Sequence, residues 1–201
     1  MEATTFRQKM QIAREDAILS AVNTLLASKG FEAMTVDDVA AEAGIAKASL
    51  YRHFPSKEDL AAAAMARMLD EVLALCASLP AEQDEVDKLK AVAHWAMFSQ
   101  LAGTMPSLPH ANSSLVATLS RNEAYLQRVF KLSDCMGEWI VLAQEKGSLN
   151  AALPPQLILY NLFARACDPV LAVLKATGGY SDAEVVELQW QACFSGLGGK
   201  A

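Results

Sequence analysis

Apolar residues recur at intervals of three and four along almost the whole 201-residue chain, and no segment alternates with a sustained period of two. Such a recurrence places apolar side chains on one face of an α-helix, whereas a half-buried strand requires strict alternation. Gly30, Gly44, Pro80, Gly147 and the pair at 178–179 interrupt the pattern and divide it into segments. The sequence therefore predicts an all-α protein.

Hydroxyl residues followed three positions later by an acid predict where several helices begin, because such pairs cap the free N–H groups of a first turn. These pairs are Thr35 with Asp38, Ser56 with Asp59, Ser120 with Glu123 and Ser181 with Glu184. A first helix is expected to end at Gly30, and a short helical piece is expected after Pro109. The other expected helices span residues 35–43, 46–53, 56–78, 84–102, 120–146, 155–176 and 181–196.

Charge is distributed unevenly along the chain, whose formal net charge is −6. Residues 1–57 carry seven Lys or Arg and seven Asp or Glu, whereas residues 58–201 carry ten and sixteen. The acidic excess thus lies in the second part, which indicates two functional halves. Residues 91–120 contain no Asp, Glu, Lys or Arg, but prolines, a glycine and polar residues interrupt this run too often for a membrane-spanning helix.

The four cysteines are scattered and form no CxxC pair, and the first ten residues, MEATTFRQKM, do not read as a signal peptide. We therefore expect reduced thiols in a cytoplasmic protein. Small buried hydrophobic residues are one interpretation of these cysteines, and redox sensing or metal ligation is another. The four positions are Cys76, Cys135, Cys167 and Cys193.

Residues 44–60, GIAKASLYRHFPSKEDL, concentrate cations, hydroxyls and a tyrosine on one short element of an acidic protein. Together with residues 35–43 they predict two short helices joined by a glycine turn, the plan of a helix-turn-helix. Small side chains would let the second helix approach base edges in the major groove, and the cations and hydroxyls would bind phosphates. Solvated charges on an ordinary helical hairpin are the alternative interpretation.

The segment TVDDVAAEAGIAKASLYRHFPSKEDL, with the KGF before it, resembles the DNA-binding domain of the tetracycline-repressor (TetR) family of transcriptional regulators over about residues 8–60. The resemblance implies an N-terminal three-helix helix-turn-helix DNA-binding domain over residues 1–55. It also implies a C-terminal helical effector-binding and dimerisation domain over residues 56–201. It places Ala46 where the family often has Ser or Thr, which removes one cap or phosphate contact.

The resemblance further implies a set of DNA contacts. The set comprises Thr35, Lys47, Ala48, Ser49, Tyr51, His53 and Lys57. Lys47 and Ser49 would lie at the DNA face, Ala48 would allow a close approach, and Lys57 would reach the backbone from the following helix. The remaining members would bind phosphates.

The second half would provide the dimer and the effector pocket. The last two expected helices have apolar stripes that suit a four-helix bundle across a two-fold axis. A pocket is expected among the middle helices, at His94, Phe98, Met136 and Trp139, because apolar aromatic walls with few polar groups suit small molecules. Ordinary core packing is the alternative for these four residues.

The sequence thus predicts a ligand-responsive repressor that binds a palindromic operator as a homodimer and is released by a small lipophilic or aromatic effector. No catalytic constellation, cofactor or metal site is expected, because the histidines lack ligand spacing and no phosphate loop is present. A helical small-molecule binding protein or enzyme with an incidental basic hairpin is the alternative. A regulator controlled by a protein partner or by cysteine oxidation is a third.

Overall fold

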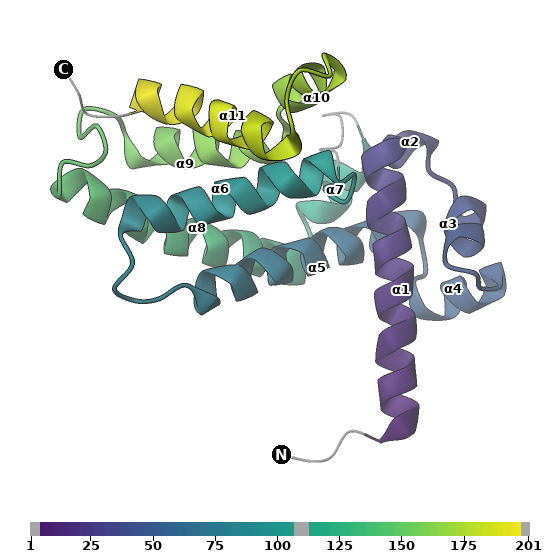
Figure 1. The fold of residues 1–201 in the computed structure, drawn as a ribbon. Helices are drawn as coiled ribbons and strands as arrows, with labels where there is room; N and C mark the ends of the chain where they lie inside the picture. The colour runs from purple at the N-terminus through teal and green to yellow at the C-terminus, as the bar shows by residue number, and fades with distance from the viewer. Residues whose placement is uncertain (1–4, 107–112, 198–201) are drawn as a thin grey trace. The chain divides into compact units, whose positions relative to one another are not determined.

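The computed structural model describes residues 5–106 and 113–197, whose regular secondary structure is helical with no strand among them. The predicted all-α class is therefore confirmed. His110 and part of the uncharged run lie outside the described residues. In chain order the elements are α1 (Phe6–Ser28), α2 (Gly30–Ala33), α3 (Val36–Glu42), α4 (Lys47–His53), α5 (Lys57–Ser78), α6 (Glu85–Leu101), α7 (Ser114–Leu119), α8 (Glu123–Glu145), α9 (Pro155–Phe163), the 3₁₀ helix η1 (Ala164–Cys167), α10 (Pro169–Ala176) and α11 (Asp182–Leu197) (Figure 1).

The chain divides into two compact units. The first comprises Met1–Met68 with Pro106–Leu126, and the second comprises Leu69–Met105 with Gln127–Ala201. Both α5 and α8 therefore contribute residues to each unit. The predicted boundary after residue 55 divides the chain by function, whereas these two units are divided by compactness. The predicted boundary therefore stays a prediction.

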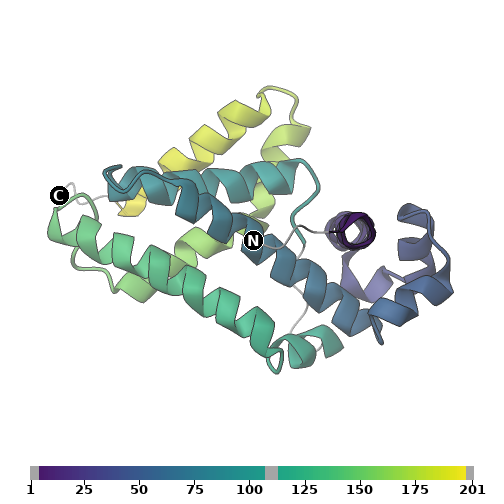
Figure 2. The same cartoon turned by 90° about the horizontal axis from the view of Figure 1, so that it is seen from below.

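The first unit packs α2, α3, α4 and the start of α5 beside α1, which Figure 2 shows along its axis. The apolar stripe of α1 supplies Ile18, Val22 and Leu26, each buried in this core. Leu50 of α4 and Leu60 of α5 are each 1% exposed in the same cluster. The spacing of these apolar residues along each helix thus decides which face turns inward.

Three of the four predicted capping pairs are present. Thr35 Oγ1 accepts from the Asp38 N–H at 3.1 Å while the Thr35 N–H donates to Asp38 Oδ2 at 3.0 Å, so the capping box is complete. The Asp59 N–H donates to Ser56 Oγ, and Ser181 and Glu184 form a reciprocal pair. Local chemistry therefore fixes where α3, α5 and α11 begin.

The predicted cap at Ser120 is wrong. Ser120 ends α7, and its hydroxyl donates to the Val116 carbonyl instead. The first turn of α8 is capped by Asn122, whose Oδ1 accepts from the Tyr125 N–H at 2.9 Å. Both residues can serve as caps, and the end of α7 decides between them because it uses Ser120 in its own last turn.

The single helix predicted over residues 155–176 is also wrong. After α9 the chain forms η1, reaches Asp168 in an extended conformation and begins again at Pro169. A proline inside a helix removes a hydrogen bond and disfavours helical geometry in the residue before it. Among described residues no single helix is long and apolar enough to span a membrane; Pro155–Cys167 with Pro169–Ala176, bent by 42°, meets that test only as a pair.

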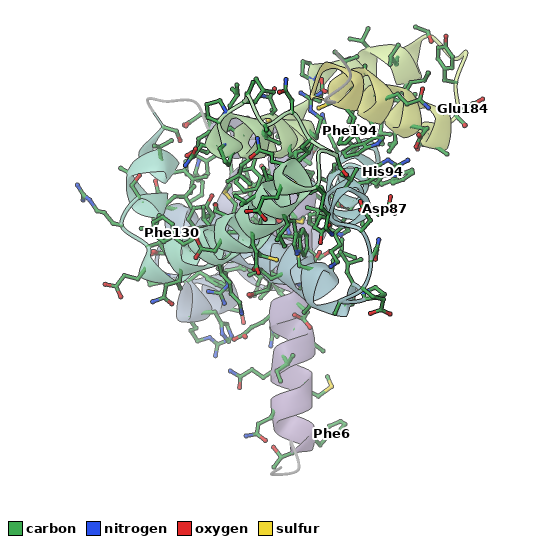
Figure 3. The ribbon with its side chains drawn as sticks, turned by 90° about the vertical axis from the view of Figure 1, so that its left-hand side faces the viewer. Phe6, Asp87, His94, Phe130, Glu184 and Phe194 are labelled. Atoms are coloured by element: carbon green, nitrogen blue, oxygen red, sulfur yellow. The ribbon has the colours of Figure 1, made fainter. Side chains whose placement is uncertain are left out.

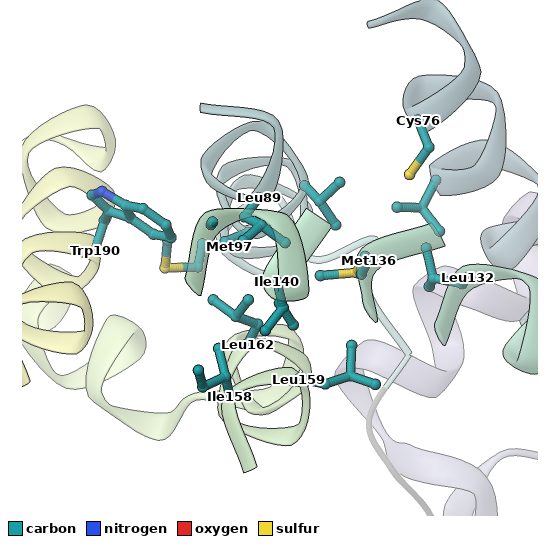
Figure 4. Packing of buried hydrophobic residues seen from close by; sticks show 14 of the residues in the cluster. Cys76, Leu89, Met97, Leu132, Met136, Ile140, Ile158, Leu159, Leu162 and Trp190 are labelled. Atoms are coloured by element: carbon teal, nitrogen blue, oxygen red, sulfur yellow. The ribbon is translucent and has the colours of Figure 1, made fainter. Parts of the chain in front are cut away.

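The core of the second unit lies among α6, α8, α9 and α11 with the end of α5 (Figure 4). Met97 and Ile140 are fully buried near its centre. Leu159 and Leu162 of α9 pack against this centre, and Trp190 closes it on the α11 side. The second unit is thus a packed helical layer structure with apolar side chains at its centre.

Candidate DNA-binding and effector sites

The turn between α3 and α4 has the geometry that a helix-turn-helix requires. Gly44 has a φ of 65°, a left-handed conformation that glycine adopts without steric cost. The Ile45 N–H donates to the Ala40 carbonyl at 3.0 Å and the Gly44 N–H to the Ala41 carbonyl at 3.2 Å. These two bonds form a Schellman motif, which ends α3 and directs the chain into α4.

The exposed face of α4 carries three of the seven predicted DNA contacts. Lys47, Ala48 and Tyr51 are exposed, and the Tyr51 side chain retains 48% of its accessible surface. Leu50 points the other way into the core. Small side chains beside a cation and a phenol hydroxyl suit close approach to a duplex flanked by phosphates.

Lys47 is paired with an acid of the preceding helix. Its Nζ lies 2.8 Å from Asp37 Oδ2, and both side chains remain exposed, at 47% and 72%. The hydrogen bond to Asp37 raises the pKa of Lys47. Because exposed ion pairs contribute little to stability, Lys47 can exchange this partner for a phosphate or a base edge at low cost.

Ser49 differs from the other predicted contacts because the structure buries it. Only 3% of its surface is accessible, and its Oγ accepts from Arg52 Nη2 at 3.2 Å. A direct role for Ser49 at the DNA face stays a prediction. By accepting this hydrogen bond, Ser49 orients the exposed side chain of Arg52.

Lys57 is held by backbone carbonyls at the end of α2. Its Nζ donates to the Phe31 carbonyl at 3.0 Å and to the Met34 carbonyl at 3.2 Å, and it lies 4.2 Å from the centroid of the Phe31 ring. A lysine ammonium has three donors, so one remains for a phosphate. Lys57 therefore has a structural task in addition to the predicted DNA contact.

His53 and Thr35 lie at the two margins of the helix-turn-helix. His53 Nδ1 is 3.4 Å from Glu15 Oε1 of α1, and its ring borders an open depression that Met10 and Arg14 also line. The Thr35 hydroxyl donates to Asp38 at 2.8 Å. Hydrogen bonds from Lys29 and then from Thr35 lower the pKa of Asp38 to about 2.

His94, the first of the predicted effector residues, lies between α6 and α11 (Figure 3). Its ring meets Phe98 and Trp190 edge-on, at centroid distances of 6.2 and 6.0 Å. No group among the described residues hydrogen-bonds its Nε2, although Glu187 Oε2 lies 3.7 Å away. Burial, and then the charge of Lys90, lower the pKa of His94.

The four predicted effector residues differ in their surroundings. Phe98 is 41% exposed, whereas Met136 is 1% exposed within the core. Figure 4 places Met136 and Trp190, the neighbour of His94, on opposite sides of Met97. A pocket that joins all four residues therefore stays a prediction, and His94 with Phe98 is the more accessible pair.

A buried polar network at Asp168 was not predicted from the sequence. Asp168 is 4% exposed, and its Oδ2 accepts from Arg165 Nη1 and, at 2.5 Å, from Gln189 Nε2. The Gln100 side chain bonds both the N–H and the carbonyl of Asp168, at 3.0 and 2.8 Å. The dipeptide Asp168–Pro169 is a helix-start signal that could have located it.

Known proteins resemble this chain in the sequence of its helix-turn-helix and in its fold. Residues 18–64 match the family model described as bacterial regulatory proteins, tetR family. The match covers the helix-turn-helix segment and part of the helices on either side of it. Its helix-turn-helix segment is 41% identical over 58 residues to the HTH-type transcriptional repressor KstR2 of Mycolicibacterium smegmatis, a match covering 29% of this chain and 28% of that protein.

Several solved structures share the fold over most of the chain. The fatty acid degradation regulator FadR from Bacillus halodurans has a TM-score of 0.63 at 20% identity, over 92% of this chain and 96% of that one. FadR from Bacillus subtilis, in complex with stearoyl-CoA, has a TM-score of 0.60 at 16% identity, over 92% and 99%. At these identities the likeness establishes the fold alone.

Proposed function

We propose that this protein is a ligand-responsive transcriptional repressor that binds a palindromic operator as a homodimer. The observation that carries the proposal is the exposed face of α4, where Lys47, Ala48 and Tyr51 stand on a helix that a Schellman turn orients. The match of residues 18–64 to the model of the tetR family of bacterial regulatory proteins supports the same role for this segment. DNA binding, rather than catalysis, is therefore the proposed activity of the protein.

The proposed dimer interface lies on the last helices. Leu157 and Tyr160 of α9, Val173 of α10 and Leu188 of α11 are large apolar residues with 46%, 66%, 64% and 43% of their surface exposed. A dimer that binds a palindromic operator has to place its two copies of α4 about 34–36 Å apart, one helical turn of DNA. A single helix-turn-helix reads too few base pairs to select an operator.

The proposed effector is a lipophilic small molecule bound by the second unit. His94 supports this choice, because a neutral imidazole with an unbonded nitrogen beside Phe98 and Trp190 offers one polar contact within an apolar aromatic wall. Because the structural relative FadR from Bacillus subtilis binds stearoyl-CoA, a long-chain acyl-CoA is the first probe to test.

DNA binding is tested by selecting the preferred sequence from random DNA and mapping the protected bases. We expect two symmetric half-sites one helical turn apart, and an affinity that falls steeply with salt. Absence of binding at low salt would instead favour the alternative of a helical small-molecule protein. The effector class is tested by adding stearoyl-CoA to the protein bound to the selected operator. We expect stearoyl-CoA to release the wild-type protein from the operator but not the variant Phe98→Glu.

The dimer is tested with matched charge substitutions. Leu188→Glu on α11 should produce monomers in sedimentation and weaken operator binding in parallel. Val141→Glu on α8, where the wild-type side chain is 42% exposed against 43% for Leu188, should remain dimeric. Dimers that survive Leu188→Glu would move the interface to another surface.

A further inference from the structure

Helices α5 and α8 run side by side in the second unit, and an ion pair shows which of their residues lie at the same level. Arg128 Nε lies 2.8 Å from Asp70 Oδ1, and both views show the helices extending in roughly the same direction (Figures 1 and 2). Cys76 follows Asp70 by six residues and Cys135 follows Arg128 by seven. At 1.5 Å per residue these steps are about 9 Å and about 10.5 Å, so both cysteines lie at the same level.

The surroundings of the two cysteines are apolar. Cys76 is buried in the same cluster as Val72, Leu132 and Met136, and Figure 4 shows Cys76 beside Leu132 and Met136. Cys135 packs against that cluster. Cys135 is only partly buried, so it is the more accessible of the two. The pair therefore combines one enclosed thiol with one that a small molecule can reach.

The thiols also interact directly. Burial raises the pKa of both, that of Cys76 to about 12, and their mutual interaction lowers the pKa of Cys135 while it raises that of Cys76. Cys76 therefore keeps its proton. Cys135 is the thiol that ionises first.

We propose that Cys76 and Cys135 are an oxidisable dithiol, a modification site at which hydrogen peroxide closes an intramolecular disulfide between α5 and α8. The Cys135 thiolate attacks the O–O bond, forming a sulfenic acid, and the other peroxide oxygen leaves as water after it takes up a proton. The Cys76 thiol then attacks the sulfenic sulfur, loses its proton and displaces the hydroxyl group as a second water. Two electrons pass from the sulfur pair to the peroxide, which balances the reaction.

The rate and the consequence follow from the same geometry. Because burial limits the thiolate fraction, the pair responds to sustained rather than brief exposure. The S–S bond of about 2.05 Å is much shorter than a contact between two thiols, so closure draws α5 toward α8. No Gly or Pro interrupts α5 from Lys57 to Ser78, and the displaced helix therefore moves as a rod. An effect on operator affinity rests on the proposed function.

The site is tested in the full chain with the other two cysteines removed, as Cys167→Ser with Cys193→Ser. After treatment with hydrogen peroxide and digestion without reductant, we expect the peptides containing Cys76 and Cys135 to be joined. The intact monomer should lose two hydrogen atoms, and dithiothreitol should reverse the change. Free thiols at both positions, or sulfonic acids without a crosslink, would overturn the proposal.

The order of attack has its own control. Adding Cys76→Ala to the same variant removes the resolving thiol, so Cys135 should stop at the sulfenic acid and be labelled by dimedone. Adding Cys135→Ala instead should leave Cys76 unlabelled. Dimedone labelling of Cys76 would reverse the assigned roles and contradict the mechanism.

The regulatory consequence is measured as operator affinity of the oxidised and reduced double variant. We expect affinity to fall by about tenfold on oxidation, within the usual range of coupling between sites, and to recover with dithiothreitol. A crosslinked protein with unchanged affinity would remove the regulatory role. If the reduced protein binds no operator, the proposed function is contradicted. The proposed disulfide is not affected by that result, because the crosslink is measured without DNA.

Discussion

The helix-turn-helix and the region around Asp168 use charged groups in opposite ways. Lys47–Asp37 and Lys29–Asp38 are exposed pairs between residues close in sequence. Asp168, by contrast, is buried and bonds Gln100 and Gln189 from distant helices. Exposed pairs can exchange partners with DNA at little cost, whereas a buried network holds helices in place because its groups have no water to replace a lost partner.

The largest expected loss of stability comes from removing the buried carboxylate of Asp168. Asp168→Ala leaves the Arg165 charge, whose side chain is 16% exposed, without its carboxylate and should destabilise the protein by about 3–5 kcal/mol in urea unfolding. The matched control is Asp182→Ala, which removes the exposed partner of Lys175 and should cost less than about 1 kcal/mol. Equal losses in the two variants would remove the distinction.

Lys57 lies between the two cases, since it bonds carbonyls and retains a donor for DNA. Lys57→Met keeps the apolar stem but loses both carbonyl contacts, so stability should fall by about 2 kcal/mol. The salt slope of operator binding should also fall, by about 1. Lys131→Met on the exposed face of α8 is the control for both. A stability loss without any change in slope would leave Lys57 a purely structural residue.

The turn that presents α4 is tested by the backbone. Gly44→Ala places a Cβ at a φ of 65° and should destabilise the protein by about 1–2 kcal/mol, although the added atom meets no neighbour within 4 Å. Gly137→Ala on α8 is equally free of neighbours but helical, and it should stabilise by up to about 1 kcal/mol. Changes of the same sign would show that space, rather than the left-handed conformation, governs Gly44.

The smallest effect concerns the exposed pairs and appears only in acid. The folded-state pKa of Asp38 is lowered from 3.8 to about 2, so its contribution to stability is present above pH 3.8 and is lost as the pH falls through about 2. Asp38→Asn lacks this titration. In acid unfolding curves between pH 5 and pH 1.5, the wild type should therefore lose stability more steeply than the variant. Parallel curves would contradict the assigned pKa.

Much of the helix-turn-helix could be predicted because its decisive interactions are short in sequence. The Thr35–Asp38 box joins residues three apart, and the turn at Gly44 depends on one backbone angle. The break at Pro169 has an equally local signal, the proline itself, which the single helix predicted over residues 155–176 contradicts. The cap at Ser120 failed for another reason, since Asn122 is an equally good cap and only the end of α7 decides between them.

The amino-acid sequence by itself determined the helical class, most helix starts and the face that each helix buries, because periodicity and caps act within a few residues. Only the tertiary structure decided that Ser49 is enclosed, that Lys57 turns toward the Phe31 carbonyl and that Asp168 gathers bonds from two other helices. It also brought Cys76 to the level of Cys135, as the ion pair between α5 and α8 shows. These outcomes depend on the register in which distant helices pack, and that register is set by the fit of whole cores rather than by any local pattern.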